Sequence, residues 1–280
     1  MGQLNGKVAI VTGASRGIGR ALSIALAREG AKIVLASKTM NPNPRLPGTL
    51  DDVKNEIEKA GGTALIHQTD VREESQIESL VGTTVKELGG LDILINNAGA
   101  LFWSSVEQTP AKRFDLVMDV NVRATFLCCS AAIPHLRARG GGSIVNMSPP
   151  VTAGCMPNRV AYMISKFGMS MVTEGLAVEV AKDNIKVHSL WPVTMVESQA
   201  TIGHHMGERS MWRTPEIVVD STLALLTGKA SVPSGQTVYD EDVLSLVGVK
   251  DFSRYACVPG TNPPRLRLDD PSSYWRQTGA

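Results

Sequence analysis

Short apolar runs alternate with longer segments of helical periodicity along most of the chain, and this alternation restricts the possible folds more than any other feature. Seven runs have the length and the β-branched content of buried strands. They are Val8–Val11, Ile33–Ala36, Ala64–Ile66, Ile93–Ile95, Ile144–Asn146, Val187–Leu190 and Gln236–Tyr239. Strands that alternate with helices form parallel sheets, because each helix returns the chain to the same edge. The sequence therefore predicts an α/β fold with a seven-stranded parallel sheet in a doubly wound three-layer sandwich.

Three segments interrupt this alternation. Residues 41–48 hold three prolines and predict a rigid loop between the second strand and the next helix. Residues 197–213 hold two glycines and little periodicity, which is typical of a mobile lid. Residues 240–280 follow the last strand and are rich in proline, so extended chain is expected there rather than a long helix.

Charge and cysteine content disfavour several classes of function. The 28 basic and 27 acidic residues give a net charge of +1 and are spread along the chain, so we expect no nucleic-acid partner. No apolar stretch is expected to span a membrane and no signal peptide is evident, which favours a cytoplasmic protein. Adjacent His204 and His205 lack further ligands at suitable spacing, so no metal is predicted. Four cysteines without CxxC spacing are expected to be reduced: Cys128, Cys129, Cys155 and Cys257.

A glycine-rich motif follows the first predicted strand and begins a helix. Residues 12–19 read Thr-Gly-Ala-Ser-Arg-Gly-Ile-Gly. Glycines permit a tight turn and let backbone N–H groups approach a pyrophosphate at the positive end of the helix. A lone glycine pattern is weak, but a position between strand and helix is what a dinucleotide site requires. We therefore predict a Rossmann-type domain whose cofactor contacts include Gly13, Ser15, Arg16, Gly17, Ile18 and Gly19.

The end of the second strand indicates which dinucleotide binds. NAD sites usually carry an acidic side chain there for the ribose 2′-hydroxyl, whereas this chain has Ser37 and Lys38. Lys38 and Arg16 can pair with the 2′-phosphate of NADP, and Ser37 can donate a hydrogen bond to it. NADP(H) is therefore favoured over NAD(H); the alternative is that both cations are merely solvated.

Two further groups of residues follow the third and fourth strands, at the edge where α/β sheets bind ligands. Asp70 and Val71 follow the third strand, and Asp70 can accept a hydrogen bond from the adenine amino group. The fourth strand is followed by Asn97, Ala98 and Gly99. We expect residues 1–280 to form a single NADP-binding domain, with 240–280 as a C-terminal extension that packs on it or on a neighbouring subunit.

Three motifs, taken together and in this order, resemble the short-chain dehydrogenase/reductase family. They are TGxxxGxG at 12–19, NNAG at 96–99 and Tyr162-x-x-x-Lys166, and the similarity covers residues 5 to about 240. The segments 36–39, 146–150 and 190–192 are similar to the hydroxysteroid dehydrogenase-like subgroup, some of whose members carry an additional sterol-carrier domain. The resemblance implies an NADP(H)-dependent oxidoreductase that interconverts an alcohol and a carbonyl as a homotetramer or homodimer.

The pair Tyr162 and Lys166 indicates the mechanism. Residues four apart share one face of a helix, so the lysine cation and an oxidised nicotinamide are expected to lower the phenol pKa below about 10. Tyr162 would act as general acid in reduction and general base in oxidation. Family resemblance implies that Lys166 also binds the nicotinamide ribose. It assigns Asn121 to a water-linked proton relay, although a polar residue at a helix kink is the alternative.

Two positions depart from the family pattern. The serine that orients the carbonyl usually lies thirteen residues before the tyrosine, where this chain has Pro149. We favour Ser148 in that role; otherwise the hydrogen bond is missing and catalysis is weaker. Val193 follows Pro192 where the family has glycine, so the backbone below the nicotinamide must tolerate a side chain. The amide near Met195 is still expected to bind the carboxamide.

Apolar residues near the expected site favour an apolar or lipid-like substrate, although they could equally be core: Leu101, Phe102, Trp103, Met206, Met211 and Trp212. A rival hypothesis is a catalytically weak nucleotide-binding regulator or scaffold on the same fold. Pro149 and Val193 suggest it, whereas intact Tyr162 and Lys166 argue against it. A sugar-nucleotide epimerase would also carry YxxxK, but about forty residues after the last strand are too few for its substrate domain.

Overall fold

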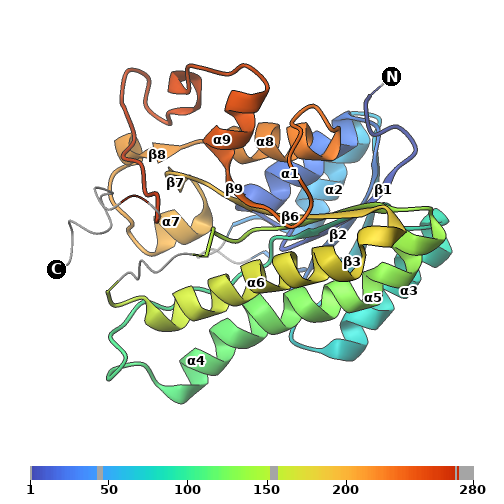
Figure 1. Ribbon diagram of the computed structural model, residues 1–280, viewed down its shortest axis with the longest axis horizontal. Coiled ribbons are helices and arrows are strands. Elements are labelled where there is room, and N and C mark those ends of the chain that lie inside the picture. The colour runs from blue at the N-terminus through green and yellow to red at the C-terminus, as the bar shows by residue number, and fades with distance from the viewer. Residues whose placement is uncertain (1, 43–46, 152–156, 269, 271–280) are drawn as a thin grey trace.

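The computed structural model describes residues 2–42, 47–151, 157–268 and 270, and its centre is a seven-stranded sheet between two helical layers (Figure 1). Each predicted run falls in or overlaps one strand, and every pairing is parallel. The α/β prediction, a Rossmann-type doubly wound sandwich, is therefore confirmed. The strands are β1 (Val8–Thr12), β2 (Lys32–Ser37), β3 (Thr63–Gln68), β4 (Ile93–Asn96), β5 (Gly142–Asn146), β6 (Ile185–Trp191) and β9 (Thr237–Tyr239).

The strand order β3-β2-β1-β4-β5-β6-β9 creates the edge at which a ligand can bind. The chain begins at the central β1, extends to one side through β3, and then crosses to β4 on the other side. In open α/β sheets, ligands bind outside the carboxyl ends of the strands where the order reverses in this way. Val11 in β1 pairs with Leu35 in β2 and Ile95 in β4. The turns that follow these three strands therefore meet at one edge.

Alternate residues of the central strands enter two separate apolar cores. Val11 belongs to the core beneath one helical layer, and its neighbour Ile10 belongs to the other. This follows from the strand geometry, because successive side chains point to opposite faces. The first layer contains α1 (Gly17–Arg28), α2 (Leu50–Lys59), α8 (Glu216–Leu226) and α9 (Asp240–Leu246). The second contains α3 (Glu74–Leu88), α5 (Ala124–Ala138) and α6 (Val160–Glu179) (Figure 1).

One long helix differs from the sequence prediction in its composition. It runs through α4 (Ala111–Val117), the π-helical turn η1 (Met118–Arg123) and α5. Its 28 residues include an 18-residue window of mean hydropathy 1.5, which is long and apolar enough for a membrane span, contrary to our expectation. Packing explains this composition, because α5 buries Cys128, Cys129, Ala132 and Leu136 against the sheet.

The predicted lid, residues 197–213, has more regular structure than expected. It contains α7 (Gln199–Gly203) and the 3-10 turn η3 (Arg209–Met211), and it ends in β8 (Trp212–Arg213), which pairs with β7 (Met195–Val196). These elements are two to five residues long, too short for a periodic sequence pattern to indicate them. Only part of the predicted proline loop lies within the described residues.

The described part of the C-terminal extension packs on its own chain. Cys257 N–H donates to the Trp212 carbonyl at 3.0 Å, and Leu266 N–H donates to the Val193 carbonyl at 2.6 Å. Its regular elements up to residue 268 are α9 and the 3-10 turn η4 (Ser253–Tyr255). The described residues thus give the extension no sheet of its own, and it lies against the carboxyl edge of β6.

Candidate active site

A cavity of about 550 Å³ lies along the carboxyl edge of the sheet. The turns after β1, β2, β3 and β4 form one end, and α6 with the chain after β6 forms the other. Every residue predicted to bind the cofactor lines it: Gly13, Ser15, Arg16, Gly17, Ile18, Gly19, Ser37, Lys38, Asp70, Val71, Asn97, Ala98, Gly99, Tyr162, Lys166, Pro192 and Met195. The fold therefore brings together residues from six separate parts of the sequence.

The glycine turn is shaped by close backbone approaches. Gly13 has a φ of 69°, and a Cβ there would lie 2.9 Å from the Ala98 Cα atom. A Cβ on Gly19 would lie 2.3 Å from the Gly13 carbonyl oxygen. Asn97 fixes the turn, because its Nδ2 donates to the Thr12 carbonyl at 2.9 Å. These contacts require glycine and leave the first turn of α1 directed into the cavity, as phosphate binding demands.

Two cations and a hydroxyl group lie at the end of the cavity near β2. Ser37 Oγ is 3.3 Å from Ser15 Oγ, and Arg16 Nη2 donates to the Gly48 carbonyl at 3.3 Å. Among the ion pairs of the described residues, neither Arg16 nor Lys38 has a carboxylate partner. Asp70 instead bonds Arg72, whose Nε lies 2.9 Å from Oδ1, and this bond holds the carboxyl pKa below its ordinary value. Both cations are thus available to an anion.

Tyr162 and Lys166 lie on α6; the lysine is buried, and the tyrosine is partly buried. Lys166 Nζ donates to the Met147 carbonyl at 2.8 Å, and burial lowers the Lys166 pKa to about 7. Burial raises the pKa of the Tyr162 phenol. Desolvation disfavours the phenolate, and the ammonium is bonded to Met147. The expected lowering of this pKa below 10 by the lysine together with an oxidised nicotinamide stays a prediction, because the nicotinamide would add positive charge beside the phenol. The phenol is a neutral proton donor at physiological pH.

Asn121 lies in the π-helical turn and is fully buried. Its Oδ1 accepts a hydrogen bond from Ala100 N–H at 2.8 Å, and its Nδ2 donates to Ser165 Oγ at 2.8 Å. It is not among the residues that line the cavity, but a Cβ on Gly99 would lie 3.6 Å from its Oδ1 and 3.8 Å from Lys166 Nζ. The π turn places this amide behind Gly99, beside the lysine.

The structure does not bring Ser148 into the cavity. Its side chain is fully buried, and its Oγ lies 2.7 Å from Ser189 Oγ on β6. Ser189 Oγ in turn lies 2.6 Å from Thr173 Oγ1, so these hydroxyl groups form a network beneath α6. After Pro149 the structure describes residues 150 and 151. The segment 152–156, which includes Cys155, lies outside the described residues.

Val193 is accommodated because its backbone does not adopt the conformation that favours glycine. Among the described non-glycine residues, positive φ occurs at Asn158, Asn184 and His205, and not at Val193. The Val193 N–H donates to Asp240 Oδ1 at 3.0 Å, and burial raises the pKa of that carboxyl to about 7. The Val193 side chain is fully buried in the core. This loop is therefore held from behind and leaves Pro192 and Met195 facing the cavity.

The far end of the cavity is apolar. Three of the six apolar residues that the sequence suggested for the substrate site line the cavity. Leu101, Trp103 and Met206 line it, whereas Phe102, Met211 and Trp212 do not. Trp212 is buried and its Nε1 donates to the Met206 carbonyl at 2.7 Å. Leu266 and Leu268 also line the cavity and were missed. Their alternation with Arg265 and Arg267 is a period-two signal that could have indicated an extended segment with one apolar side.

Comparison with known proteins agrees with this geometry. The model of the short chain dehydrogenase family matches residues 7–205. The chain belongs to the short-chain dehydrogenase family. Members of this family are NAD(P)-dependent oxidoreductases, which fits the nucleotide-shaped cavity.

Individual relatives extend the similarity over most of this short-chain dehydrogenase. Hydroxysteroid dehydrogenase-like protein 2 of Danio rerio is 42% identical over 92% of this chain and 63% of its own length. The Homo sapiens protein of that name is 41% identical over 92% of this chain and 62% of its own. The chain thus spans less than two thirds of these relatives. A short chain dehydrogenase structure from Mycobacterium thermoresistibile has 35% identity and a TM-score of 0.86, covering 97% of this chain and 99% of that one.

Among the described residues of this short-chain dehydrogenase, no cysteine or histidine lines the cavity. Cys128, Cys129 and Cys257 are free and buried, and burial raises the pKa of Cys128 to about 12 and that of Cys257 to about 11. Thiols of this kind are poor nucleophiles at neutral pH. Within the described residues, no group of three or more potential metal ligands occurs, and His204 and His205 do not line the cavity.

Lys166→Met is expected to change how the stability of this dehydrogenase depends on pH. The native pKa of about 7 lies below the ordinary lysine value of 10.5, so unfolding takes up a proton between these pH values. The cost of the buried ammonium is complete below pH 7 and declines as the pH rises towards 10.5. The variant's free energy of unfolding relative to wild type should therefore fall by about 3 kcal/mol from pH 7 to 9.5. Urea unfolding of both proteins at pH 7 and 9.5 measures this difference in the free energy of unfolding. A difference that is the same at both pH values would contradict the shifted pKa.

Proposed function

We propose that this chain is an NADP(H)-dependent oxidoreductase that interconverts an alcohol and a carbonyl on a small, apolar or lipid-like substrate. The observation that carries the proposal is a shared cavity: Tyr162 and Lys166 line the same space as the glycine turn and the cations near β2. A dinucleotide along this edge would place its nicotinamide between Tyr162 and the chain after β6. Carbonyl reduction then needs an acid near the hydride donor, and the neutral Tyr162 phenol is suited to that role.

The preference for NADP(H) over NAD(H) rests on Arg16, Ser37 and Lys38. All three line one end of the cavity, and neither cation is neutralised by a carboxylate among the described ion pairs. A 2′-phosphate carries charge that a guanidinium and an ammonium can pair with, whereas the 2′-hydroxyl of NAD gains little from them. Asp70 is engaged by Arg72 and would accept a hydrogen bond from the adenine amino group.

Lys38→Asp tests the cofactor assignment. We expect it to weaken NADPH binding about 10- to 100-fold, since a charge-assisted hydrogen bond contributes about 1.5–3 kcal/mol. NADH binding should stay unchanged or strengthen, because a carboxylate can accept a hydrogen bond from the ribose 2′-hydroxyl group. Both Kd values would be measured by titration at one ionic strength, because phosphate contacts are screened by salt. The exposed Lys229→Asp, which is remote from the cavity, is the matched control. Equal loss of both nucleotides would contradict the assignment, and binding of neither by wild type would refute the enzyme proposal.

Lys166 and Asn121 support Tyr162 in this proposal. Lys166 would hold the nicotinamide ribose hydroxyls, and a bound oxidised nicotinamide would add positive charge beside the phenol. That charge lowers a phenol pKa, which burial alone raises here, so proton removal in the oxidative direction becomes easier. Asn121, beside Lys166 behind Gly99, would extend the path of the proton through water.

Ser148 favours a second candidate function, a nucleotide-binding regulator or scaffold with weak catalysis. Its Oγ is bonded to Ser189 inside the core, so it does not offer the hydrogen bond that usually orients the carbonyl. Loss of one such donor typically costs about 10²- to 10³-fold in rate. If the protein binds NADPH but reduces no carbonyl compound, this alternative is favoured.

A homotetramer or homodimer in the cytoplasm completes the proposal. The outer side of α6 exposes Ile164, Met171 and Val178, each seven residues apart, with exposed fractions of 46%, 66% and 79%. Phe126 on the neighbouring α5 is 59% exposed. An apolar stripe on two adjacent helices is typical of a subunit interface.

A further inference from the structure

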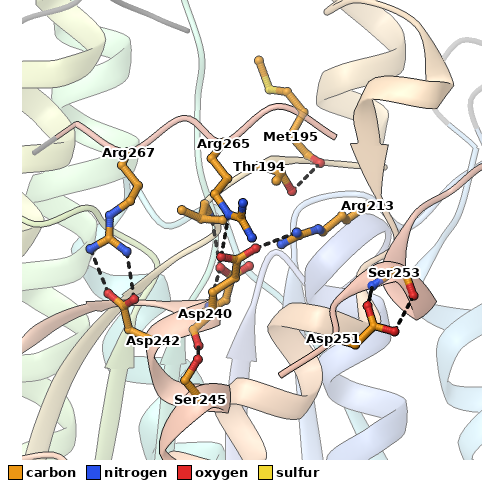
Figure 2. Close-up of polar contacts among 12 residues, drawn as sticks. Thr194, Met195, Arg213, Asp240, Asp242, Ser245, Asp251, Ser253, Arg265 and Arg267 are labelled. Carbon is orange, nitrogen blue, oxygen red and sulfur yellow. Dashed lines mark hydrogen bonds and ion pairs between the residues drawn. The ribbon is translucent and has the colours of Figure 1, made fainter. Parts of the chain in front are cut away.

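Four consecutive residues near the end of the described chain alternate between two environments. Arg265 Nε donates to Glu241 Oε2 at 2.8 Å, and Arg267 donates to both carboxylate oxygens of Asp242 at 2.8 and 3.0 Å (Figure 2). Leu266 and Leu268 between and after them are 5% and 4% exposed and line the cavity. This alternation is what an extended chain produces, with two arginines against α9 and two leucines towards the site.

Backbone hydrogen bonds fix the register of this segment. Leu266 N–H donates to the Val193 carbonyl at 2.6 Å, and Leu268 N–H donates to Tyr239 Oη at 2.9 Å. The N–H of the same residue, Val193, donates to Asp240 Oδ1. The segment is therefore attached to the loop after β6, the loop that faces the nicotinamide end of the cavity. If the segment shifted by one residue, its arginines would face the cavity in place of the leucines.

The leucines lie beside the proposed proton donor. They form one apolar cluster with Met163, against which Tyr162, Trp103, Phe167 and Met195 pack. Three of these neighbours, Tyr162, Trp103 and Met195, also line the cavity. A substrate whose carbonyl reaches Tyr162 would therefore extend past Leu266 and Leu268. Polar substituents there would lose their hydration without gaining a partner.

We propose that Arg265–Leu268 is the specificity-determining wall of the substrate site, selecting carbonyl compounds with an apolar chain. This inference rests on the proposed function, because the apolar chain of the substrate is positioned relative to Tyr162, the proposed proton donor. The arginines hold the wall against α9, and the leucines present its apolar surface. A ketone with a straight hydrocarbon chain has the required chemistry, so 2-undecanone is a suitable probe.

Leu268→Asp tests the wall by calorimetric titration of 2-undecanone into protein loaded with NADP⁺, which cannot reduce the ketone. The buried carboxylate should weaken ketone binding at least about tenfold, whereas Leu268→Met should stay within about threefold of wild type. Leu246→Asp, at a leucine that is 61% exposed on α9, is the matched control and should bind the ketone normally. NADP⁺ binding should be unchanged in all three variants.

Leu268→Ala gives a second measurement if the aspartate variant fails to fold. It removes three carbons from the wall, so affinity for 2-undecanone relative to 2-octanone should rise about threefold. Wild-type affinity in Leu268→Asp, an unchanged ratio in Leu268→Ala, or no binding of 2-undecanone to wild type would each overturn the proposal. Failure of wild type to bind NADP⁺ would instead refute the proposed function, and the same ketone titrations without nucleotide would still decide the role of the wall.

Discussion

Tyr162→Phe is expected to lower NADPH-dependent carbonyl reduction by about 10²- to 10⁴-fold, the usual contribution of a general acid. The phenol lines the cavity, and desolvation raises its pKa, so at neutral pH it carries the proton that the developing alkoxide requires. Phenylalanine retains the ring packing and removes that proton. NADPH oxidation measured at 340 nm with straight-chain ketones and aldehydes gives the rate, and titration gives the nucleotide Kd, which should stay within about twofold.

The control for this variant is Tyr255→Phe. Tyr255 is a buried tyrosine, with 2% exposure, and its hydroxyl group donates to Asp220 at 2.7 Å outside the cavity. Its loss should affect stability rather than turnover. Full reductase activity in Tyr162→Phe would show that the proton comes from another group and would refute the assigned role.

Glu241→Gln is expected to destabilise the protein by about 3–5 kcal/mol, as breaking a buried ion pair from one side does. Glu241 is 7% exposed and lies 2.6 Å from Arg213 and 2.8 Å from Arg265. Arg213 is 2% exposed, and within the described part of the chain its Nε and Nη1 have no hydrogen-bond partner, so Glu241 is the carboxylate that pairs with it at ion-pair distance. Urea unfolding at neutral pH gives the change in the free energy of unfolding.

Two comparisons separate the effect of burial from that of charge. Asp242→Asn removes the partner of Arg267 from a pair with side-chain exposures of 28% and 48%, and it should cost less than about 1 kcal/mol. The double variant Arg213→Met with Glu241→Gln should recover stability, because no unpaired buried charge remains. A loss below 1 kcal/mol in Glu241→Gln alone would show that the buried arginine is solvated or paired elsewhere.

The nucleotide end of the site was predictable because its signals are local. Gly13 and Gly19 are required by close approaches within one turn, and Ser37 and Lys38 stand at the end of a strand whose apolar run is evident in the sequence. Parallel strand order then brings such turns to one edge. Tyr162 and Lys166 were identified for a similar reason, since a spacing of four residues defines one helix face.

Other features depended on contacts between distant parts of the chain. Ser148 turns towards Ser189, forty-one positions later, and no local pattern reveals that hydrogen bond. Burial, a property of the whole fold, raises the pKa of the Tyr162 phenol, and no local pattern in the sequence indicates this. The long apolar helix resembles a membrane span in composition, and its packing on the sheet accounts for that composition.

The sequence by itself determined the layered sheet, the glycine turn, and the pair Tyr162 and Lys166, because strand and helix periodicities and tight turns depend on neighbouring residues. The tertiary structure alone decided what closes the other end of the cavity. Leu266 lies seventy-three positions after Val193, to whose carbonyl its N–H donates, and Glu241 and Asp242 hold the arginines on either side of it. An extended segment has no internal hydrogen bonds, so its position is set by the surface that receives it.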